Sequence, residues 1–169
     1  MKKLLLVVFC FILSACNKTI DPAPFGLNWD MVESDIDKLL TEESKKEVKK
    51  DYILYSNVKV PAGEIDGGLY LLYFKENKLE KISVSYSESF RDVHKVEKIL
   101  DYYKSSLEQK YGKGKKVEPS VDDKKMCAEI NYCKKEILAY SASGVDIKLT
   151  FTVNTDTPSY FVFVSFIKQ

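Results

Sequence analysis

Few side chains in this 169-residue chain could perform acid–base or nucleophilic chemistry. His94 is the only imidazole, and it lies beside an apolar stripe in a charged segment, where a solvated surface histidine is the ordinary role. No serine lies in a Gly-x-Ser-x-Gly turn, and Ser143-Gly144 is typical of a connection between strands. Gly67-Gly68 lacks the Lys-Ser/Thr pair of a phosphate-binding loop. Because a hydrolase needs a nucleophile with its base, the sequence predicts no catalytic residue, no cofactor and no enzyme activity.

The remaining reactive side chains are four cysteines. Cys127 and Cys133 have five residues between them, a spacing that can close a small disulfide loop in an oxidising compartment. A metal site is the alternative, but it needs two more ligands, and His94 lies far away in the sequence. The sequence therefore favours a disulfide, worth at most about 2–4 kcal/mol for so small a loop, and predicts no metal.

Cys16 follows an N-terminal segment with the features of an export signal. A positive start, a ten-residue apolar run and two small residues precede it: Lys2 and Lys3, Leu4–Leu13, and Ser14 and Ala15. Ten apolar residues are too few for a transmembrane helix, which needs about 20. The segment resembles the lipobox of bacterial lipoproteins, which implies that residues 1–15 are a signal peptide and that Cys16 carries diacylglycerol and an N-acyl chain such as palmitate. An ordinary secreted protein is the alternative.

The resemblance to lipoproteins also implies a location. Several acyl chains, at about 0.8 kcal/mol per buried CH₂, make an anchor of this kind effectively permanent. Asn17 stands where an aspartate commonly signals inner-membrane retention, so the resemblance favours the periplasmic face of the outer membrane. Residues 16–24, which contain Asp21-Pro22 and Pro24, are typical of a short tether between membrane and domain.

The size and charge of the remaining chain limit its class. Removal of residues 1–15 leaves 154 residues, so residues 25–169 are predicted to form a single periplasmic domain with a core of its own. Without Lys2 and Lys3, the chain has 24 basic and 25 acidic residues. This balance offers no excess of positive charge for a phosphate backbone, so nucleic acid is excluded as a partner.

Apolar patterns predict one short helix, one long helix and about six strands. The short helix follows Asp30, which can form a capping box with Glu33. The long helix spans 90–111 after a capping box of Ser89 and Asp92, and its apolar stripe is typical of core packing rather than of a membrane surface. Strands are predicted at 52–58, 69–74, 79–86, 136–140, 145–153 and 160–167. This order predicts an α+β fold with a mainly antiparallel sheet packed against both helices.

Side-chain alternation predicts which strand faces meet water. Residues 145–153 alternate cleanly, and Lys148 is among the side chains that face outward, as in a half-exposed antiparallel strand. Residues 160–167 are apolar at both sets of positions, which predicts a central strand covered on both faces. Ser83 and Ser85 alternate with apolar neighbours, so their side of the sheet is expected to meet water.

Residues 25–31, Phe-Gly-Leu-Asn-Trp-Asp-Met, resemble a recurring opening of small bacterial envelope proteins, Phe-Gly-Leu-x-Trp-Gly-Met-Ser followed by a short helix. Residues 73–82 and 107–112 are similar to the strand–turn–strand and the second-helix end of those proteins. Asp30 replaces the usual glycine, and Val32 replaces the usual helix-capping serine or threonine. Such proteins are loosely similar to the small lipoprotein of the outer-membrane barrel-assembly machinery and to the β-lactamase-inhibitor-like fold. The resemblance therefore implies binding rather than catalysis.

Three functions are compatible with these features. The first is a non-enzymatic envelope lipoprotein that binds a protein or cell-wall partner. Tyrosine is enriched at binding surfaces, and the chain has eleven tyrosines; the alternative is that these tyrosines are half-buried along strand edges. The second is an inhibitor or immunity lipoprotein that blocks a toxic cell-wall-directed enzyme. Ser143-Gly144 is similar to a loop of lipoprotein lysozyme inhibitors, although Asp146 or Ile147 stands where those have tyrosine. The third is a small hydrolase with His94 as its base.

Overall fold

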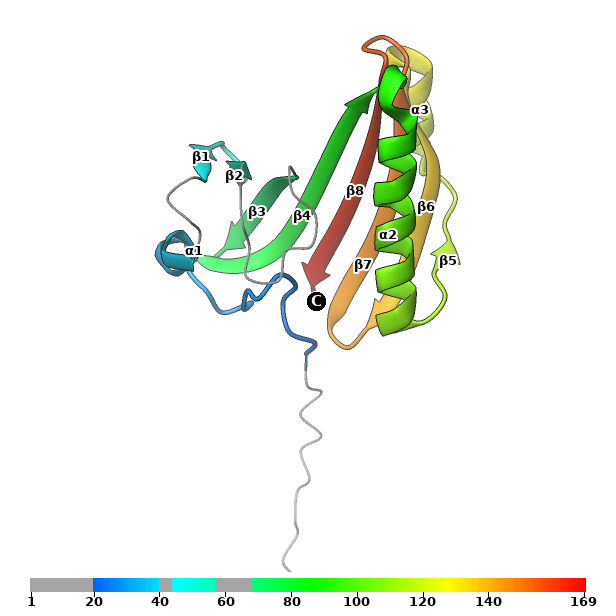
Figure 1. Cartoon of the computed structure of the whole chain (residues 1–169). Helices are drawn as coiled ribbons and strands as arrows, with labels where there is room; N and C mark the ends of the chain where they lie inside the picture. The colour runs from blue at the N-terminus through cyan, green and yellow to red at the C-terminus, as the bar shows by residue number, and fades with distance from the viewer. Residues whose placement is uncertain (1–19, 40–43, 57–67) are drawn as a thin grey trace, which may run out of the picture.

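The structure, a computed structural model, describes residues 20–39, 44–56 and 68–169, which build an α+β fold around one sheet. Its eight strands have the order β1-β2-β3-β4-β8-β7-β6-β5, and every neighbouring pair is antiparallel. The strands are β1 Lys45–Val48, β2 Ile53–Ser56, β3 Leu69–Lys75, β4 Lys78–Ser89, β5 Lys115–Lys116, β6 Tyr132–Ala142, β7 Val145–Asn154 and β8 Ser159–Lys168. The helices are α1 Glu33–Leu39, α2 Val93–Tyr111 and α3 Val121–Ile130, with a 3-10 turn at Phe90–Asp92. The long, curved β4 joins the two halves of the sheet (Figure 1).

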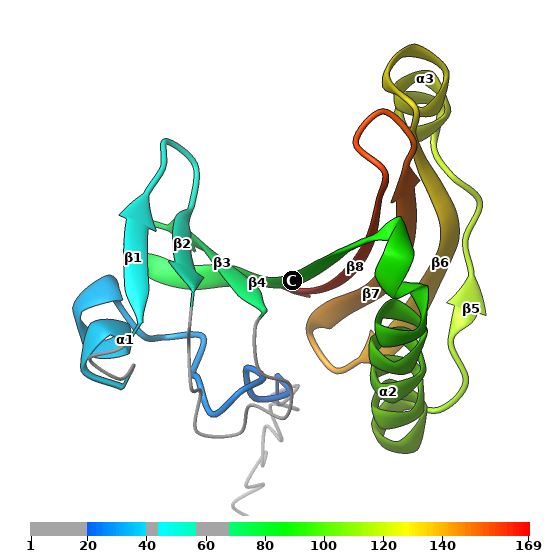
Figure 2. The same cartoon turned by 45° about the horizontal axis from the view of Figure 1, so that its top comes forward.

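Helices α1 and α2 lie on the same side of the sheet, which we call the inner face (Figure 2). Val84, Val164 and Leu149 stand side by side on neighbouring strands there, and each is at most 1% exposed. The predicted apolar stripe of α2 packs against them through its buried Val96 and Leu107. Burial of each such aliphatic side chain stabilises the fold by about 1.5–3 kcal/mol, so the inner face holds the main core.

The segment that opens the described chain also packs on the inner face. The ring of Phe25 meets Tyr70 and Phe166 edge to face, at centroid distances of 5.4 and 5.8 Å. Phe25 has a φ of +63°, which is unfavourable for a bulky residue and is offset here by its buried ring. Trp29 is 4% exposed, and its indole N–H donates to the carbonyl oxygen of Asp21 at 3.0 Å. The Phe-Gly-Leu-x-Trp motif therefore has a structural role, which is to fix this segment against the inner face of the sheet.

The predicted α+β class and antiparallel sheet are confirmed, but the prediction of about six strands is wrong. The strand β1 lies in a charged segment that shows no apolar alternation, and β5 has only two residues. The third helix, α3, was not predicted because none of its residues is buried, so it has no apolar stripe. Its capping box, Ser120 with Asp123, is the sequence signal that could have revealed it.

Both predicted capping boxes differ from the structure. The helix α1 begins at Glu33, so Val32, which has no side-chain acceptor, precedes it, and Asp30 lies in an earlier turn with its N–H bound to Asn28. Before α2, the Ser89 hydroxyl donates to the Asp92 carboxylate at 3.4 Å, and neither side chain caps a backbone N–H. The Asp30 carboxylate pairs instead with Lys168 at 3.7 Å, and Ser89 binds Asp92, so α1 begins two residues and α2 three residues later than predicted.

Candidate binding surface

The face of the sheet opposite α1 and α2, which we call the open face, is the main candidate functional surface. Strand β8 is central, as predicted, but within residues 20–39, 44–56 and 68–169 no helix covers its second face, so the predicted cover on both faces is not found there. Of the described helices, α1 and α2 lie on the inner face and α3 packs along β6. The open-face side chains of β8, which include Phe161 and Phe163, are half-buried, whereas the inner-face Val162 and Val164 are fully buried.

Aromatic side chains form two separate groups on the open face, and we call the larger one, Phe161, Phe163 and Tyr132, the aromatic strip. The rings of Phe161 and Phe163 stack with centroids 6.0 Å apart and planes inclined by 11°. Tyr132 of β6 lies 5.7 Å from Phe161. On the other half of the sheet, Tyr73 and Tyr52 form a similar pair at 5.5 Å. Large, partly exposed aromatic side chains of this kind are typical of the centres of protein interfaces.

The middle of the open face is polar. Ser83 of β4 pairs with Ser165 of β8, and their hydroxyl oxygens are 2.9 Å apart. Ser83 and Ser85 are predicted to meet water; both lie on the open face, but their neighbours leave them only 5% and 8% exposed. Lys148 of β7 stands beside Ser165 in the register. Lys81 of β4 places its ammonium 4.4 Å from the ring centre of Tyr73. We call Lys81, Ser83, Lys148 and Ser165 the lysine–serine centre.

Neither lysine of this centre has an acidic partner in the part of the chain that the structure describes. Within residues 20–39, 44–56 and 68–169, no carboxylate oxygen lies within 4.0 Å of Lys81 or Lys148. The pKa of Lys81 is below its ordinary value, first because partial burial disfavours the ammonium and second because Lys148 is also positive. Asp146, also on the open face of β7, already accepts a hydrogen bond from the Gln169 amide at 2.8 Å. The centre is thus a small positive region within an aromatic surface.

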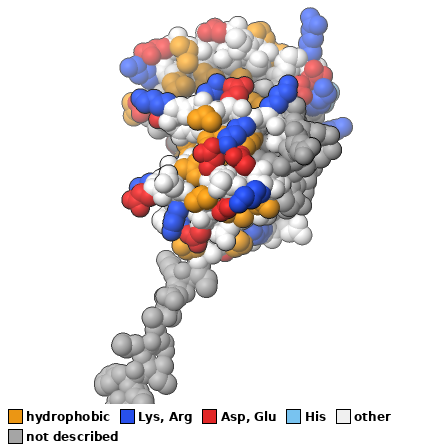
Figure 3. All heavy atoms as spheres, turned by 90° about the vertical axis from the view of Figure 1, so that its left-hand side faces the viewer, with side chains coloured by type: hydrophobic (Ala, Val, Ile, Leu, Met, Phe, Trp, Pro, Cys, Tyr) orange, Lys and Arg blue, Asp and Glu red, His pale blue; other side chains and the backbone are white. Residues whose placement is uncertain are grey.

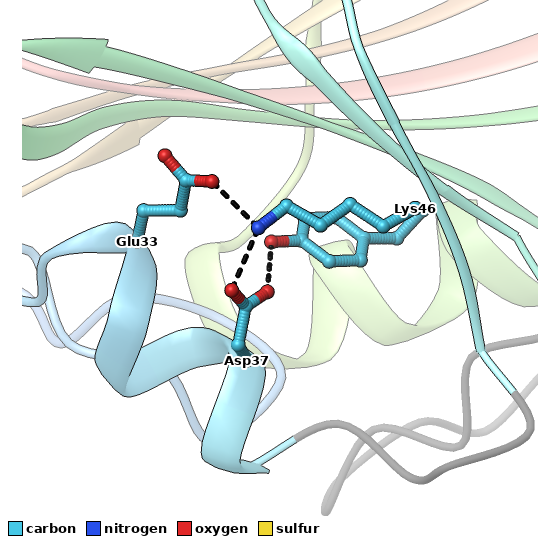
Figure 4. Close-up of polar contacts among 4 residues, drawn as sticks. Glu33, Asp37 and Lys46 are labelled. Atoms are coloured by element: carbon cyan, nitrogen blue, oxygen red, sulfur yellow. Dashed lines mark hydrogen bonds and ion pairs between the residues drawn. The ribbon is translucent and has the colours of Figure 1, made fainter.

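A second polar cluster ties α1 to the edge of the sheet (Figure 4). Lys46 of β1 reaches Glu33 and Asp37 of α1, with its ammonium 2.6 Å from the Asp37 carboxylate. The Tyr55 hydroxyl donates to the other oxygen of Asp37 at 2.7 Å. An open hollow of about 590 Å³ adjoins this cluster between α1 and the first strands. On this side of the molecule acidic and basic side chains are mixed with scattered apolar ones (Figure 3).

The protonation states of this second cluster suit a structural tie rather than acid–base catalysis. Partial desolvation opposes the charge on Asp37, but the hydrogen bonds from Lys46 and Tyr55 outweigh it, and the net pKa is lowered. For Lys46 the hydrogen bonds to Asp37 and Glu33 outweigh desolvation in the same way, and its pKa is raised. Burial and the bond to Asp37 raise the pKa of Tyr55. At neutral pH all three groups are held in their ordinary states, so none is poised to exchange a proton.

The structure places the predicted reactive residues apart from one another. Cys127 and Cys133 are disulfide-bonded, as predicted, and the bond joins α3 to β6. Cys16 lies outside the described residues. His94 is exposed on α2, where its imidazole pairs with Glu97 at 3.1 Å. Within the described residues, no group of three or more potential ligands could hold a metal ion, and no helix is long and apolar enough to cross a bilayer.

The Ser143-Gly144 turn is engaged within the fold. The N–H of Asp21 donates to the Ser143 carbonyl at 2.8 Å, and the Ser143 N–H donates back to the Asp21 carboxylate at 3.1 Å. Gln169 binds the Gly144 carbonyl, and the Ile20 side chain packs where a Gly144 Cβ would be. A loop held by both ends of the described chain differs from a free loop that could enter an enzyme's active site.

The chain matches no protein-family model, no curated protein and no solved structure. The open face must therefore be interpreted from its own residues. Of the tyrosines noted in the sequence, Tyr73 and Tyr132 lie on it. The lysine–serine centre and the phenylalanine pair were not predicted as a site. The sequence signal for the phenylalanine pair is the run of apolar residues at 160–167, which are apolar on both faces of β8. Two helices packed on one face cannot cover both sets of side chains.

Proposed function

We propose that this protein is a non-enzymatic, lipid-anchored binding protein of the bacterial cell envelope, and that the open face docks a partner protein. The observation that carries the proposal is the half-buried aromatic strip of Phe161 and Phe163 on β8 and Tyr132 at the start of β6. Aromatic side chains supply large contact areas at low cost in conformational entropy. A strip on rigid antiparallel strands is also already ordered before a partner arrives, which favours affinity.

The second polar cluster and the exposed histidine support a binding role over a catalytic one. Lys46 and Asp37 are bound to each other, and their pKa values move away from neutrality. Among the described residues, the group in contact with the His94 imidazole is the carboxylate of Glu97 on the same helix, and no nucleophile lies beside it. An inhibitor or immunity function remains the second hypothesis. It gains no support from the Ser143-Gly144 turn, because that turn is held by Asp21 and Gln169.

Photo-crosslinking in living cells tests the proposed docking surface. A photoreactive amino acid is placed at Ser87 or Lys148, both exposed on the open face, or at Lys98 or Asp101, both exposed on α2. We expect one discrete protein adduct from the two open-face positions and none from the two α2 positions, with the full chain at its natural level. Equal adducts from both sets, or none from the open face, would contradict the proposal.

A matched pair of variants separates binding from folding. Phe163→Ser removes a half-buried ring from the open face, whereas Phe90→Ser removes a half-buried ring that packs on Tyr160 at the other side of the sheet. We expect Phe163→Ser to reduce the Lys148 adduct at least fivefold and Phe90→Ser to leave it within twofold. If both variants reduce the adduct alike, general destabilisation explains the loss and the surface assignment fails.

The anchor is tested separately, with a second cysteine as the control. Cells that express Cys16→Ser or Cys10→Ser are fed an alkyne-tagged palmitate, and the protein is assayed for label and for membrane association. We expect Cys10→Ser to be labelled and membrane-bound like the natural sequence, because Cys10 lies in the predicted leader. Cys16→Ser should lose both properties. Label that persists in Cys16→Ser would overturn the anchor.

A further inference from the structure

We propose that the lysine–serine centre recognises a carboxylate, so that the partner of the open face presents an acidic side chain flanked by apolar ones. This inference rests on the proposed docking function and specifies the chemistry of its partner. The centre lies at the middle of the sheet, where Ser83 and Ser165 pair across β4 and β8 and Lys148 stands beside Ser165 on β7. Ser165 lies two residues from Phe163 on the same face of β8, so a ligand that covers the Phe163 end of the aromatic strip can also reach the centre.

The side chains of the centre offer more hydrogen-bond donors than acceptors. Each ammonium of Lys81 and Lys148 has only donors. In the Ser83–Ser165 pair one hydroxyl donates to the other at 2.9 Å, which leaves the second hydroxyl proton free to donate outward. A carboxylate has two oxygens that only accept, so it matches this set, whereas an amide would bring donors of its own. Charge-assisted hydrogen bonds of this kind are about twice as strong as neutral ones.

The position of Lys81 makes a carboxylate more favourable than it would be on an exposed surface. Its ammonium is already held over the Tyr73 ring, 4.4 Å from the centroid, and its side chain is half-buried. Less conformational freedom is lost when a ligand binds a side chain that is already fixed. The charge of Lys81 is disfavoured by burial and by Lys148. A carboxylate paired with the ammonium would offset both effects, because its negative charge favours the charged form of Lys81.

The surroundings set what must flank the carboxylate. Phe163 lies beside Ser85 and Thr150 in the register, and its ring stacks on Phe161 along β8. Tyr73 flanks the centre on the β3 side. A partner segment that places an acidic residue over the centre must therefore place apolar or aromatic side chains over these rings. A highly charged or purely polar peptide would leave the rings uncovered.

Blocked tripeptides provide the probe: Ac-Phe-Asp-Phe-NH₂, its Asn isostere and its Lys counterpart. Each is titrated into the ¹⁵N-labelled full chain isolated from cells, and the amide shifts are followed by NMR. We expect shifts confined to open-face residues such as Ser83, Ser165 and Lys148, and binding of the Asp peptide at least fivefold tighter than the Asn peptide. The Lys peptide should bind least.

Variants of the two lysines then test the charge itself. Lys81→Met and Lys148→Met keep the apolar stem of each side chain, and Lys148→Met alters an exposed residue, so it leaves the fold intact. We expect both variants to lose the Asp-over-Asn preference while they retain the weaker Asn binding. The matched controls Lys95→Met and Lys98→Met, on α2, should keep the full preference.

The outcomes distinguish this inference from the proposed function. If the Asn peptide binds the open face as tightly as the Asp peptide, the carboxylate assignment is overturned and the docking surface stands. If the preference survives both lysine variants, the assignment is equally overturned. Failure of all three peptides to shift any open-face amide also overturns it, while the in-cell adduct at Lys148 decides independently whether the face has a partner.

Discussion

The inner and open faces of the sheet are built from alternate residues of the same strands, so they share one backbone and differ only in side chains. On the inner face, Val162 and Val164 are fully buried beneath α2. On the open face, Phe161 and Phe163 of the same strand are only half-buried, and Lys148, which pairs with no described carboxylate, lies on the neighbouring strand. Close packing of aliphatic side chains on the inner face stabilises the fold. The half-buried rings of the open face contribute less to the free energy of folding than they would if they were fully buried. The difference indicates that the open-face residues are suited to contact rather than to core formation.

The largest expected effect comes from testing the two faces at adjacent residues of β7. Leu149 is 1% exposed on the inner face, and Thr150 is half-buried on the open face. Leu149→Ala should lower the free energy of unfolding by about 2–5 kcal/mol, because it leaves a cavity in the core. Thr150→Ala should lower it by less than about 1 kcal/mol. Urea unfolding followed by circular dichroism measures both, and equal losses would mean that the open face carries as much of the fold as the inner face.

Much of this two-sided arrangement could be predicted from the sequence. The alternation at 145–153 correctly placed Lys148 outward and Leu149 inward, because burial on one face only produces a period of two. The apolar stripe of α2 was also interpreted correctly, since Val96 and Leu107 are buried. The class of the fold follows from the order of such elements.

The rest could not be predicted from local patterns. All four residues of β1 are exposed, and three of them are charged, so its sequence shows no alternation of buried and exposed positions. The strand is defined by its pairing with β2. The lysine–serine centre joins Lys81 and Lys148 through the pairing of β4, β8 and β7, and that strand order is a long-range property of the fold. The double apolar pattern of β8 predicts burial on both faces, because pattern alone cannot distinguish a face that the fold covers from one that it leaves half-buried.

The helices offer the same contrast, and reduction of the disulfide sharpens it. Residues of α2 are buried on the inner face, whereas α3 has no buried residue and is joined to β6 by Cys127–Cys133. Reduction should therefore destabilise α3 locally, by about 2 kcal/mol for so short a loop, and leave the sheet folded. Amide hydrogen exchange should quicken in α3 and stay unchanged at Leu149. The double variant Cys127→Ser with Cys133→Ser should behave identically without reductant, and protection of α3 in either state would contradict the interpretation.

A smaller, pH-dependent effect is expected where α1 meets the sheet edge. Asp37→Asn should lower the free energy of unfolding by about 0.5–1 kcal/mol at pH 7, since its partly exposed pair with Lys46 is screened by water. The pKa of Asp37 is below its ordinary value of 3.8 in the folded state. Its contribution is therefore complete above pH 3.8 and is lost as the pH falls through the lowered value. The unfolding curves of the two proteins should converge in acid.

Asp35→Asn is the matched control for that experiment. Asp35 lies on the same helix and pairs only with Lys38, through side chains that are 50% and 75% exposed. Exposed pairs three residues apart contribute a few tenths of a kcal/mol at most. A pH dependence as large in Asp35→Asn as in Asp37→Asn would show that the general charge of α1, and not the Lys46 cluster, is responsible.

The smallest effect is expected at His94, the one imidazole of the chain. Its replacement tests whether the function depends on this side chain or on the open face. His94 projects from α2 with its side chain 89% exposed, and its only described partner is Glu97. His94→Ala should change the free energy of unfolding by less than about 0.5 kcal/mol, as at other surface positions, and the small gain in helix propensity partly offsets the lost pair. Because α2 packs on the inner face, the Lys148 adduct and the peptide affinities at the open face should also stay unchanged. A loss of partner crosslinking in His94→Ala, with stability intact, would move the functional surface from the open face to α2.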